Sequence, residues 1–282
     1  MITPLNERNN YAVFGNPIKH SRSPVIHAAF AEQTGQKMYY RAVRVELNDF
    51  QRSASEFFAA GGAGLNVTVP FKEQAFQFAD RLSGRALRAR AVNTLTQAED
   101  GAICGDNTDG VGLLRDIVAN LGWSVAGGSV LVLGAGGAAR GILEPLLRES
   151  PPEMLIVNRT AERAAGLAAE FADLGNVAGG GYDLLEGRRF DLVINATSAG
   201  LSGEMPPLPD GILTERSCCY DLVYGSQPTT FMRWAAHQAA WAVSDGLGML
   251  VEQAAQSFFL WRKLRPDTGP VISQLREVLA AA

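Results

Sequence analysis

The stretch SVLVLGAGGAARGIL, residues 129–143, has the pattern of a buried strand, a glycine-rich turn and the start of a helix. Gly134 permits a tight turn, Gly136 lets a ligand approach the backbone, and Ala139 allows the helix to pack closely on the strand. Unpaired amides and the helix dipole at such a turn bind phosphate groups. Glycines also occur in strand–helix turns for steric reasons alone, but this order of elements favours a dinucleotide. The residues expected to contact it are Gly134, Ala135, Gly136, Gly137, Ala138 and Ala139.

The end of the next apolar run, MLIVNR, indicates which dinucleotide binds. An NAD site has an acidic residue about 20 positions after the glycine turn, where it binds the ribose 2′-hydroxyl. This chain instead has Asn158, then Arg159 and, one helical turn later, Arg163. Guanidinium groups bind a 2′-phosphate through forked, charge-assisted hydrogen bonds, so the sequence predicts NADP rather than NAD. The alternative is that both arginines are solvated surface charges.

Lys72, at the end of NVTVPFK (residues 66–72), is a candidate catalytic residue. Val67 and Val69 alternate as in a strand and Pro70 stops it, so Lys72 follows a strand end. Open α/β sheets bind ligands beyond the carboxyl ends of their strands, where an ammonium group can donate a proton. On frequency alone, a surface lysine in the first turn of a helix is the commoner explanation. Short polar and acidic side chains in similar places point to a ligand: Asn66, Thr68, Asn93, Asp106, Asn107 and Asp109.

The elements that must position these residues alternate between short apolar runs and helical stretches. This alternation predicts βαβ units in two α/β lobes. The segment DNTDGVGLLRDIVANLG, residues 106–122, starts with helix-capping residues and continues with helical apolar spacing, so we place the domain boundary there. Two helical segments at the C-terminus, split by RPDTGP, have no sheet of their own, and we expect them to pack on the first lobe.

The predicted fold class is therefore α/β with two domains. Residues 1–109 form an N-terminal α/β substrate domain with a parallel-rich sheet, joined by C-terminal helices in residues 246–282. Residues 110–245 form a Rossmann-type dinucleotide-binding domain.

The composition argues against several other classes of protein. With 282 residues, of which 47% are hydrophobic and 19% charged, the chain can form two globular domains and does not have the composition of a disordered protein. A formal net charge of -4 without a basic cluster argues against binding to nucleic acid. The polar start MITPLNERNN and the shortness of the apolar runs predict no secretory signal, no membrane association and a cytoplasmic location.

Cysteine and histidine usage argues against disulfides and against a metal site. Cys104, Cys218 and Cys219 cannot form a disulfide framework and fit a reducing compartment. The three histidines, at positions 20, 27 and 237, are scattered, and the chain has no CxxC or HxxxH motif. We therefore expect no bound metal.

Taken together, a series of motifs resembles the shikimate dehydrogenase family. They run in order from residue 14 to about residue 255 and cover nearly the whole chain. The motifs are FGNPIKHSRSP, NVTVPFKE, AVNTL, GDNTDGVG, LGAGGAARG, NRT, NATSAG, YDLVY and DGLGMLVEQAA. The resemblance implies NADP-dependent interconversion of 3-dehydroshikimate and shikimate, a step toward chorismate and the aromatic amino acids.

The resemblance also implies roles for individual residues. Lys72 and Asp109 receive the catalytic roles, and Ser21 and Ser23 bind the substrate carboxylate; seen alone, the two serines could instead cap the helix that Pro24 begins. The residues implied for the substrate hydroxyls are Asn66, Thr68, Asn93, Asp109 and Gln253, with Tyr224 and Gly246 nearby. Those implied for the dinucleotide, besides the glycine turn, are Asn158, Arg159, Thr160, Arg163, Thr197, Ser198 and Gly246.

The chemistry of the reaction is consistent with a lysine in this role. Reduction of a carbonyl carbon places negative charge on its oxygen and requires a proton, and one cationic acid serves both needs. Two alternatives remain: a quinate/shikimate dehydrogenase of relaxed specificity, and a dinucleotide-binding regulator that has lost the reaction. In either case we expect a small-molecule ligand and a protein that is a monomer or a homodimer.

Overall fold

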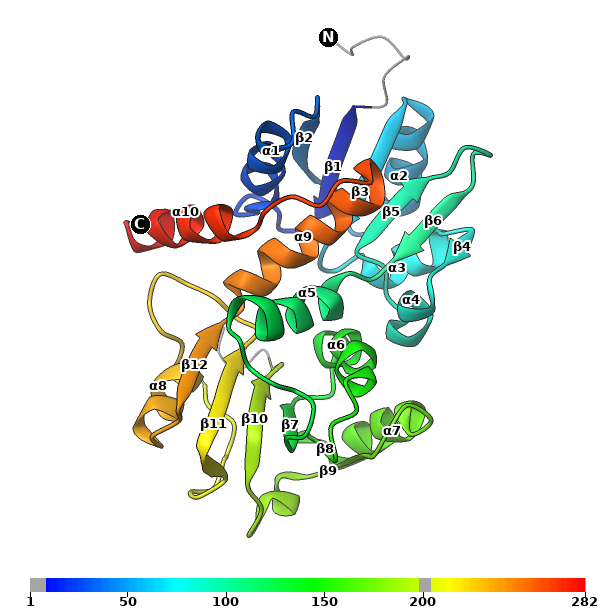
Figure 1. Cartoon of the computed structure of the whole chain (residues 1–282). Coiled ribbons are helices and arrows are strands. Elements are labelled where there is room, and N and C mark those ends of the chain that lie inside the picture. Colours follow the sequence, from blue (N-terminus) through cyan, green and yellow to red (C-terminus); the bar gives the residue numbers. More distant parts are fainter. Residues whose placement is uncertain (1–8, 198–203, 282) are drawn as a thin grey trace. The chain divides into compact units, whose positions relative to one another are not determined.

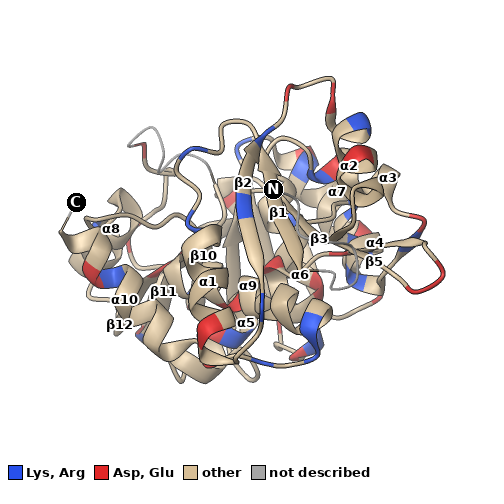
Figure 2. Ribbon diagram, turned by 90° about the horizontal axis from the view of Figure 1, so that it is seen from above, with Lys and Arg blue, Asp and Glu red and all other residues tan. Residues whose placement is uncertain are grey.

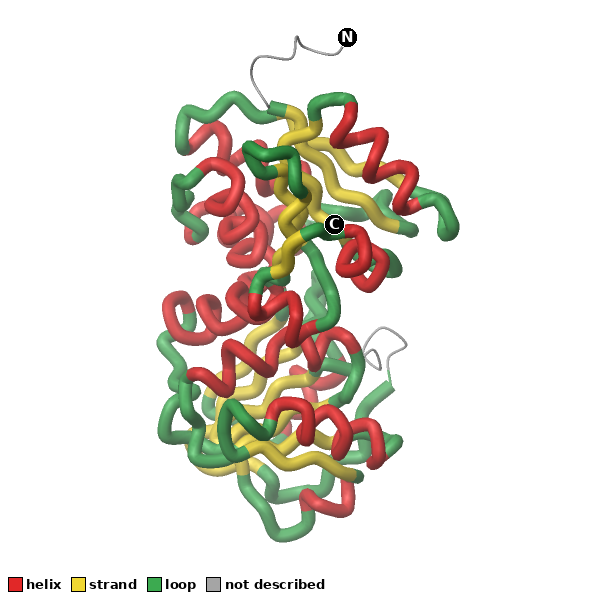
Figure 3. Tube along the Cα trace, turned by 90° about the vertical axis from the view of Figure 1, so that its right-hand side faces the viewer, coloured by secondary structure: helices red, strands yellow, loops and turns green. Residues whose placement is uncertain are grey.

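The computed structural model describes residues 9–197 and 204–281, which form two α/β units (Figure 1). Unit 1 comprises Met1–Asp109 and Val251–Val271, and unit 2 comprises Gly110–Leu250 and Ile272–Ala282. Each unit contains one six-stranded sheet flanked by helices (Figure 3). The predicted α/β class with two sheets is confirmed. Of the C-terminal segment 246–282, which is predicted to join the first lobe, Val251–Val271 belongs to unit 1 and Ile272–Ala282 to unit 2.

The sheet of unit 1 is mixed and has the strand order β2-β1-β3-β5-β6-β4. Strand β1 pairs in parallel with β2 and β3, whereas β5 is antiparallel to both β3 and β6. The short strand β4 is parallel to β6. The strands are β1 (Asn10–Gly15), β2 (Tyr39–Arg44), β3 (Gly62–Val67), β4 (Arg81–Leu82), β5 (Thr94–Gln97) and β6 (Ile103–Asp106).

The two faces of this sheet differ in character. Alternate residues of β1 and β3, such as Phe14 and Leu65, form an apolar core with phenylalanines of α2, including Phe50. The opposite face carries an aromatic cluster in which His27 of α1 packs against Trp261 of α9. The helices that supply residues to unit 1 are α1 (Ser23–Gln33), α2 (Phe50–Ala59), α3 (Lys72–Phe78), α4 (Gly84–Ala89) and part of α9 (Leu247–Arg262).

The sheet of unit 2 is parallel throughout and has the order β12-β11-β10-β7-β8-β9. The chain starts in the middle at β7, proceeds to one edge, and then returns to fill the other half. Such a doubly wound sheet binds ligands at its switch point, here between β7 and β10. Its strands are β7 (Val130–Leu133), β8 (Met154–Val157), β9 (Val177–Gly180), β10 (Phe190–Asn195), β11 (Leu213–Asp221) and β12 (Ala242–Asp245).

Helices cover both faces of the second sheet. Leucine and isoleucine side chains of α6, such as Ile142, pack on one face, and Phe231 of α8 packs on the other. The segment predicted as a single helix after residue 106 is a short α-helix followed by a π-helical turn. The helical segments of unit 2 are α5 (Asp109–Arg115), η1 (Asp116–Asn120), α6 (Gly137–Arg148), α7 (Ala161–Phe171), η2 (Tyr182–Leu185), α8 (Thr230–His237) and most of α10 (Gly269–Ala280).

The strand predicted through Val69 ends earlier, at Val67. The amide of Phe71 donates to the carbonyl oxygen of Thr68 at 3.0 Å, which closes a turn, and Val69 is 67% exposed. Lys72 follows this turn as the first residue of α3.

Charge is mixed along the elements of both units. Figure 2 shows lysine and arginine positions interspersed with aspartate and glutamate. Over the described residues, no helix is both long and apolar enough to cross a membrane.

Candidate active site and cofactor site

Lys72 and Asp109 form an ion pair in unit 1. The Lys72 ammonium donates to Asp109 Oδ2 at 2.5 Å, and the two side chains are 31% and 16% exposed. The other carboxylate oxygen of Asp109 accepts a hydrogen bond from Asn93 Nδ2 at 2.8 Å. Three of the residues implied by the resemblance thus form one continuous chain of hydrogen bonds.

The orientation of Asn93 is determined by the backbone. The amide of Thr108 donates to Asn93 Oδ1 at 2.9 Å, and because a backbone N–H can only donate, the oxygen must face Thr108. Asn93 Nδ2 therefore faces Asp109 and also donates to Gln253 Oε1 at 3.2 Å. Gln253 lies on α9, so the C-terminal tail contributes a side chain to the hydrogen bonds of Asn93, the residue that immediately precedes β5.

Asn66 lies in β3, beside the same cluster, and is almost completely buried. Its Oδ1 accepts a hydrogen bond from the Tyr40 hydroxyl at 2.7 Å, and its Nδ2 donates to Ser257 Oγ at 3.0 Å. Thr68 lies just after the strand, and its amide donates to the carbonyl oxygen of Phe14 at 2.9 Å.

The structure adds residues that are not among the predicted site residues. Thr94, Thr108 and Ser257 connect the site residues to one another: the Thr94 and Ser257 hydroxyls are 2.8 Å apart, and Thr108 Oγ1 lies 2.9 Å from Asn93 Nδ2. Thr108 occurs within the GDNTDGVG motif, and Ser257 lies one helical turn after Gln253. These spacings could have indicated both residues, whereas the sequence holds no comparable signal for Tyr40.

Ser21 and Ser23 lie at the start of α1. The N-cap position is occupied by Arg22, and its side chain makes no capping hydrogen bond. Ser21 Oγ instead accepts the Ser23 amide at 3.3 Å, and Ser23 is 9% exposed. Neither serine is the N-cap residue, and their role toward a carboxylate stays a prediction.

The glycine turn in unit 2 has the geometry that its sequence predicts. Gly134 has φ +103°, and a Cβ there would lie 3.1 Å from the carbonyl oxygen of Ala196. A Cβ on Gly136 or Gly137 would meet nothing within 4 Å, so the start of α6 is open to an approaching group. Ala139 is fully buried against the sheet.

The residues predicted to select the cofactor follow β8. Asn158 Nδ2 donates to the carbonyl oxygen of Thr160 at 3.1 Å, which shapes the turn into α7. Arg159 and Arg163 are exposed, and neither makes an ion pair with a described residue. Burial raises the pKa of Tyr182, and the nearby Arg159 guanidinium opposes this shift. Arg159 therefore lies near the end of β9.

The remaining predicted residues of unit 2 follow its other strands. Thr197, after β10, donates to Asn195 Oδ1 at 2.7 Å, and Ser198 lies outside the described residues. Tyr224 follows β11 and is half-buried. A Cβ on Gly246 would lie 2.2 Å from the carbonyl oxygen of Leu222, so this position has no room for a side chain.

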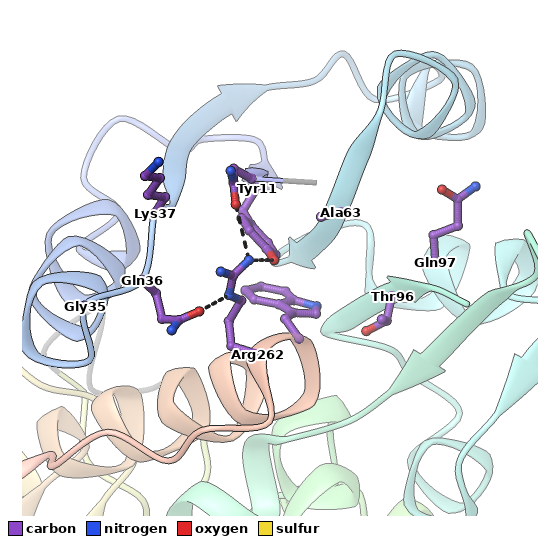
Figure 4. Close-up of a pocket in the computed structure, with 10 residues that line it drawn as sticks. Tyr11, Gly35, Gln36, Lys37, Ala63, Thr96, Gln97 and Arg262 are labelled. Atoms are coloured by element: carbon purple, nitrogen blue, oxygen red, sulfur yellow. Dashed lines mark hydrogen bonds between the residues drawn. The ribbon is translucent and has the colours of Figure 1, made fainter. Parts of the chain in front are cut away.

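Unit 1 also contains a cavity of about 570 Å³ (Figure 4). It is lined by residues at the start of β1, after α1, at the end of α9, and in β3 and β5. Arg262 Nε donates to Gln36 Oε1 at 2.8 Å inside it. Among the described residues that line this cavity, none is a predicted site residue. The described part of the chain also contains no cluster of His, Cys, Asp and Glu able to hold a metal ion.

These features define a class of protein. A doubly wound parallel sheet with a glycine-rich turn at its switch point, and a separate sheet that carries a lysine–aspartate pair, are typical of two-domain dinucleotide-dependent oxidoreductases.

Comparison with known families covers most of the chain. Residues 13–95 match the family "Shikimate dehydrogenase substrate binding domain", residues 116–201 match "Shikimate / quinate 5-dehydrogenase", and residues 246–276 match "Shikimate 5'-dehydrogenase C-terminal domain". Shikimate dehydrogenase (NADP(+)) of Cellvibrio japonicus is 56% identical over 95% of this chain and 97% of its own length. The Alkalilimnicola ehrlichii protein of the same name is 59% identical over 95% and 98%. The chain belongs to the shikimate dehydrogenase family.

Solved structures agree with this assignment. An Ael1 enzyme from Pseudomonas putida superimposes with a TM-score of 0.89 at 47% identity, covering 95% of this chain and 98% of that one. Shikimate 5-dehydrogenase from Thermus thermophilus, solved with NADP(H) and shikimate, gives a TM-score of 0.84 at 37% identity, covering 96% and 99%.

Proposed function

We propose that this protein catalyses the reversible NADPH-dependent reduction of 3-dehydroshikimate to shikimate, with Lys72 as the general acid and base and Asp109 as its partner. The observation that carries the proposal is the Lys72–Asp109 ion pair, which is surrounded by side chains able to bind hydroxyl groups. The family assignment and the names of the relatives support the same reaction. The product would feed chorismate and aromatic amino acid biosynthesis.

Lys72 has the chemistry that reduction of a ketone requires. When bound, NADPH supplies the hydride. The Lys72 ammonium then donates a proton to the carbonyl oxygen and stabilises the negative charge that develops on it. Asp109 accepts a hydrogen bond from the ammonium and so directs its remaining N–H groups, while Asn93 prevents the carboxylate from rotating. In the reverse direction, the neutral amine removes the proton of the substrate hydroxyl.

The surrounding residues provide a complementary set of groups for a cyclic, hydroxylated acid. Amide and hydroxyl side chains donate to or accept from ring hydroxyls, and two serine hydroxyls bind the carboxylate without placing another cation beside Lys72. The substrate-binding residues that we propose are Ser21, Ser23, Asn66, Thr68, Lys72, Asn93, Asp109, Tyr224 and Gln253.

The cofactor site of unit 2 fits a dinucleotide with a 2′-phosphate. Gly134 has the positive φ of the tight turn, and the open start of α6 leaves amide groups available to a pyrophosphate. Arg159 and Arg163 are both exposed around the start of α7, where two guanidinium groups can bind the 2′-phosphate. Further contacts are proposed from Asn158, Thr160, Thr197, Ser198 and Gly246.

A second candidate is an enzyme that also accepts quinate. The matched family "Shikimate / quinate 5-dehydrogenase" includes this substrate in its name. Arg159 argues for a preference for NADP, and the paired serines are consistent with shikimate as the better substrate.

One assay separates these functions. The purified protein is mixed with shikimate or quinate and with NADP or NAD, and reduced nicotinamide is followed by absorbance. Turnover with shikimate and NADP, well above that of the other three combinations, supports the proposal. Comparable turnover with quinate supports the enzyme of relaxed specificity, whereas no turnover with any combination supports a dinucleotide-binding regulator and rejects both enzymes.

We further propose that residues 1–109 with helices from 246–282 provide substrate binding, and that residues 110–245 provide NADP binding. The three free cysteines are consistent with a reducing compartment, and we propose that the protein acts in the cytoplasm. We also propose that it is a monomer or a homodimer.

A further inference from the structure

Tyr40 and Asn66 lie on the same face of the unit 1 sheet, with β1 between them. Tyr40 of β2 pairs with Tyr11 of β1, which pairs with Gly64 of β3, and Asn66 lies two residues further along β3. Because alternate residues of a strand share a face, the Tyr40 side chain can cross over β1 to reach Asn66. Its hydroxyl donates to Asn66 Oδ1 at 2.7 Å.

The carboxamide of Asn66 has only one possible orientation. Its Nδ2 lies 3.1 Å from the carbonyl oxygen of Asn93, a group that can only accept. The hydroxyls of Thr94 and Ser257, at 3.1 and 3.0 Å, give the same nitrogen further acceptors. The nitrogen therefore faces the interior, and the oxygen faces Tyr40. A carboxamide oxygen has two lone pairs, so it can accept a second hydrogen bond from a bound ligand.

The Tyr40 ring is held in place by an aromatic cluster. It stacks on His27 with ring centroids 4.2 Å apart and an angle of 14° between the planes. Trp261 packs 5.3 Å from His27, and its indole N–H donates to the carbonyl oxygen of Leu95 at 3.1 Å. Gly64 makes room for the indole, because a Cβ there would lie 2.3 Å from Trp261 Nε1.

Both His27 and Tyr40 are uncharged near pH 7, so the Tyr40 hydroxyl keeps its proton and can donate it in a hydrogen bond. Burial lowers the pKa of His27 to about 3, and the neighbouring Asn66 side chain opposes this shift, so the ring is neutral near pH 7. Neither His27 nitrogen makes a hydrogen bond with a described residue, so the imidazole serves as a flat surface for stacking. Burial raises the pKa of Tyr40 well above its usual value, and the nearby Ser23 side chain opposes this shift. Tyr40 therefore remains a neutral donor.

We propose that Tyr40 is a positioning residue for substrate binding: its hydroxyl holds Asn66 so that the carboxamide oxygen accepts a hydrogen bond from a substrate hydroxyl. This inference rests on the proposed function, because it takes Asn66 to be a substrate-binding residue. It also assigns a direction to that contact. The substrate must present a donor, that is a hydroxyl, to Asn66, while the ketone oxygen belongs beside the donor Lys72.

The test is Tyr40→Phe, which keeps the stacked ring and removes the hydroxyl. Loss of one hydrogen bond of this kind should raise KM for shikimate by about 3- to 10-fold, with kcat and KM for NADP within about 2-fold of the parent values. Tyr39→Phe is the matched control, because Tyr39 is the adjacent residue, is 62% exposed and should leave every parameter unchanged.

A double-mutant cycle with Asn66→Ala tests whether Tyr40 acts through Asn66. If it does, Tyr40→Phe has no further effect on KM once Asn66 is absent. Three results would each overturn the proposal. The first is an unchanged KM for shikimate in Tyr40→Phe, and the second is the same fold-increase in KM for shikimate with and without Asn66. The third is an equal rise in KM for shikimate and for NADP together with a lower Tm, which would indicate a general loss of structure. If the parent enzyme does not oxidise shikimate, the proposed function fails and this inference with it. An active parent with a normal Tyr40→Phe variant overturns this inference alone.

Discussion

Lys72 and Asp109 are 37 positions apart in the sequence, yet their charged atoms are 2.5 Å apart. The lysine is partly exposed, so it can exchange protons with water, while the carboxylate is held by Asn93 on its other side. Lys72 can be predicted as a catalytic residue because it follows the end of a strand. Asp109 can be predicted as its partner only from the resemblance of the motifs to the family. No local pattern links residues this far apart in the chain.

Replacing Lys72 with alanine removes the proposed acid while leaving the surrounding hydrogen-bonding groups in place. We expect kcat to fall by roughly 10²- to 10⁴-fold, the usual effect of a positioned acid or base, with little change in the Kd for shikimate. Steady-state kinetics and isothermal titration calorimetry measure the two quantities. Lys37→Ala is the control, because this exposed lysine lines the separate cavity of unit 1. Unchanged turnover in Lys72→Ala would exclude the catalytic role.

Arg159 is expected to determine the preference for NADP. Its side chain is exposed and makes no ion pair with a described residue, so removing it leaves no buried charge unpaired. Arg159→Ala should raise KM for NADP by about 10- to 100-fold, the effect of losing a charge-assisted hydrogen bond, and leave KM for NAD almost unchanged. Arg216→Ala, which alters an exposed arginine of β11, is the control. A variant that retains the NADP preference would contradict this role for Arg159.

At the level of elements, helix α9 brings the C-terminal tail to the sheet of unit 1. It supplies Gln253 to the hydrogen-bonded cluster and Trp261 to the aromatic cluster, and β3 accepts it closely because position 64 is glycine. The sequence predicts this helix from its apolar pattern, and it predicts packing on the first lobe because the helical tail has no sheet of its own. The requirement for glycine at position 64 cannot be predicted in this way, because it arises from the side chain of Trp261, 197 positions away in the sequence.

Gly64→Ala should therefore destabilise the protein. The new methyl group would lie within 2.3 Å of the indole nitrogen of Trp261, and overpacking of this kind costs about 1–3 kcal/mol. We expect Tm to fall by roughly 3–10 °C in a thermal unfolding experiment. Gly84→Ala is the matched control, since a Cβ at that position meets nothing within 4 Å. Equal Tm values for the two variants would show that Trp261 is not held tightly against β3.

Over the whole molecule, the sequence predicted the α/β class, both sheets and most helices, because strand and helix periodicities are local. It also predicted the glycine turn, whose positive φ at Gly134 is a property of a few adjacent residues. It missed the network of Thr94, Thr108 and Ser257, and it extended a strand to Val69. Those features depend on which side chains meet after folding, and a pattern of residues along one segment does not contain that information.

Acid stability is a whole-molecule property to which one buried group contributes. Burial lowers the pKa of His27 to about 3, below the usual value of 6.5, so between these values the unfolded chain binds a proton that the folded protein does not. This contribution to stability is present above pH 6.5 and is lost progressively as the pH falls toward 3. Between pH 7 and pH 5 it amounts to about 2 kcal/mol.

His27→Phe keeps a ring in the stack and removes the titrating group. Between pH 7 and pH 5 both proteins should lose unfolding free energy, and the loss should be about 2 kcal/mol smaller in the variant than in the parent. Urea unfolding at the two pH values measures both losses. His237→Gln is the control, because this histidine is exposed at the end of α8, far along the chain from the aromatic cluster of His27. If the parent and His27→Phe lose stability equally, His27 is protonated in the folded protein at pH 5. The imidazole would then carry a charge beside Tyr40, which the aromatic cluster described here could not accommodate without rearrangement.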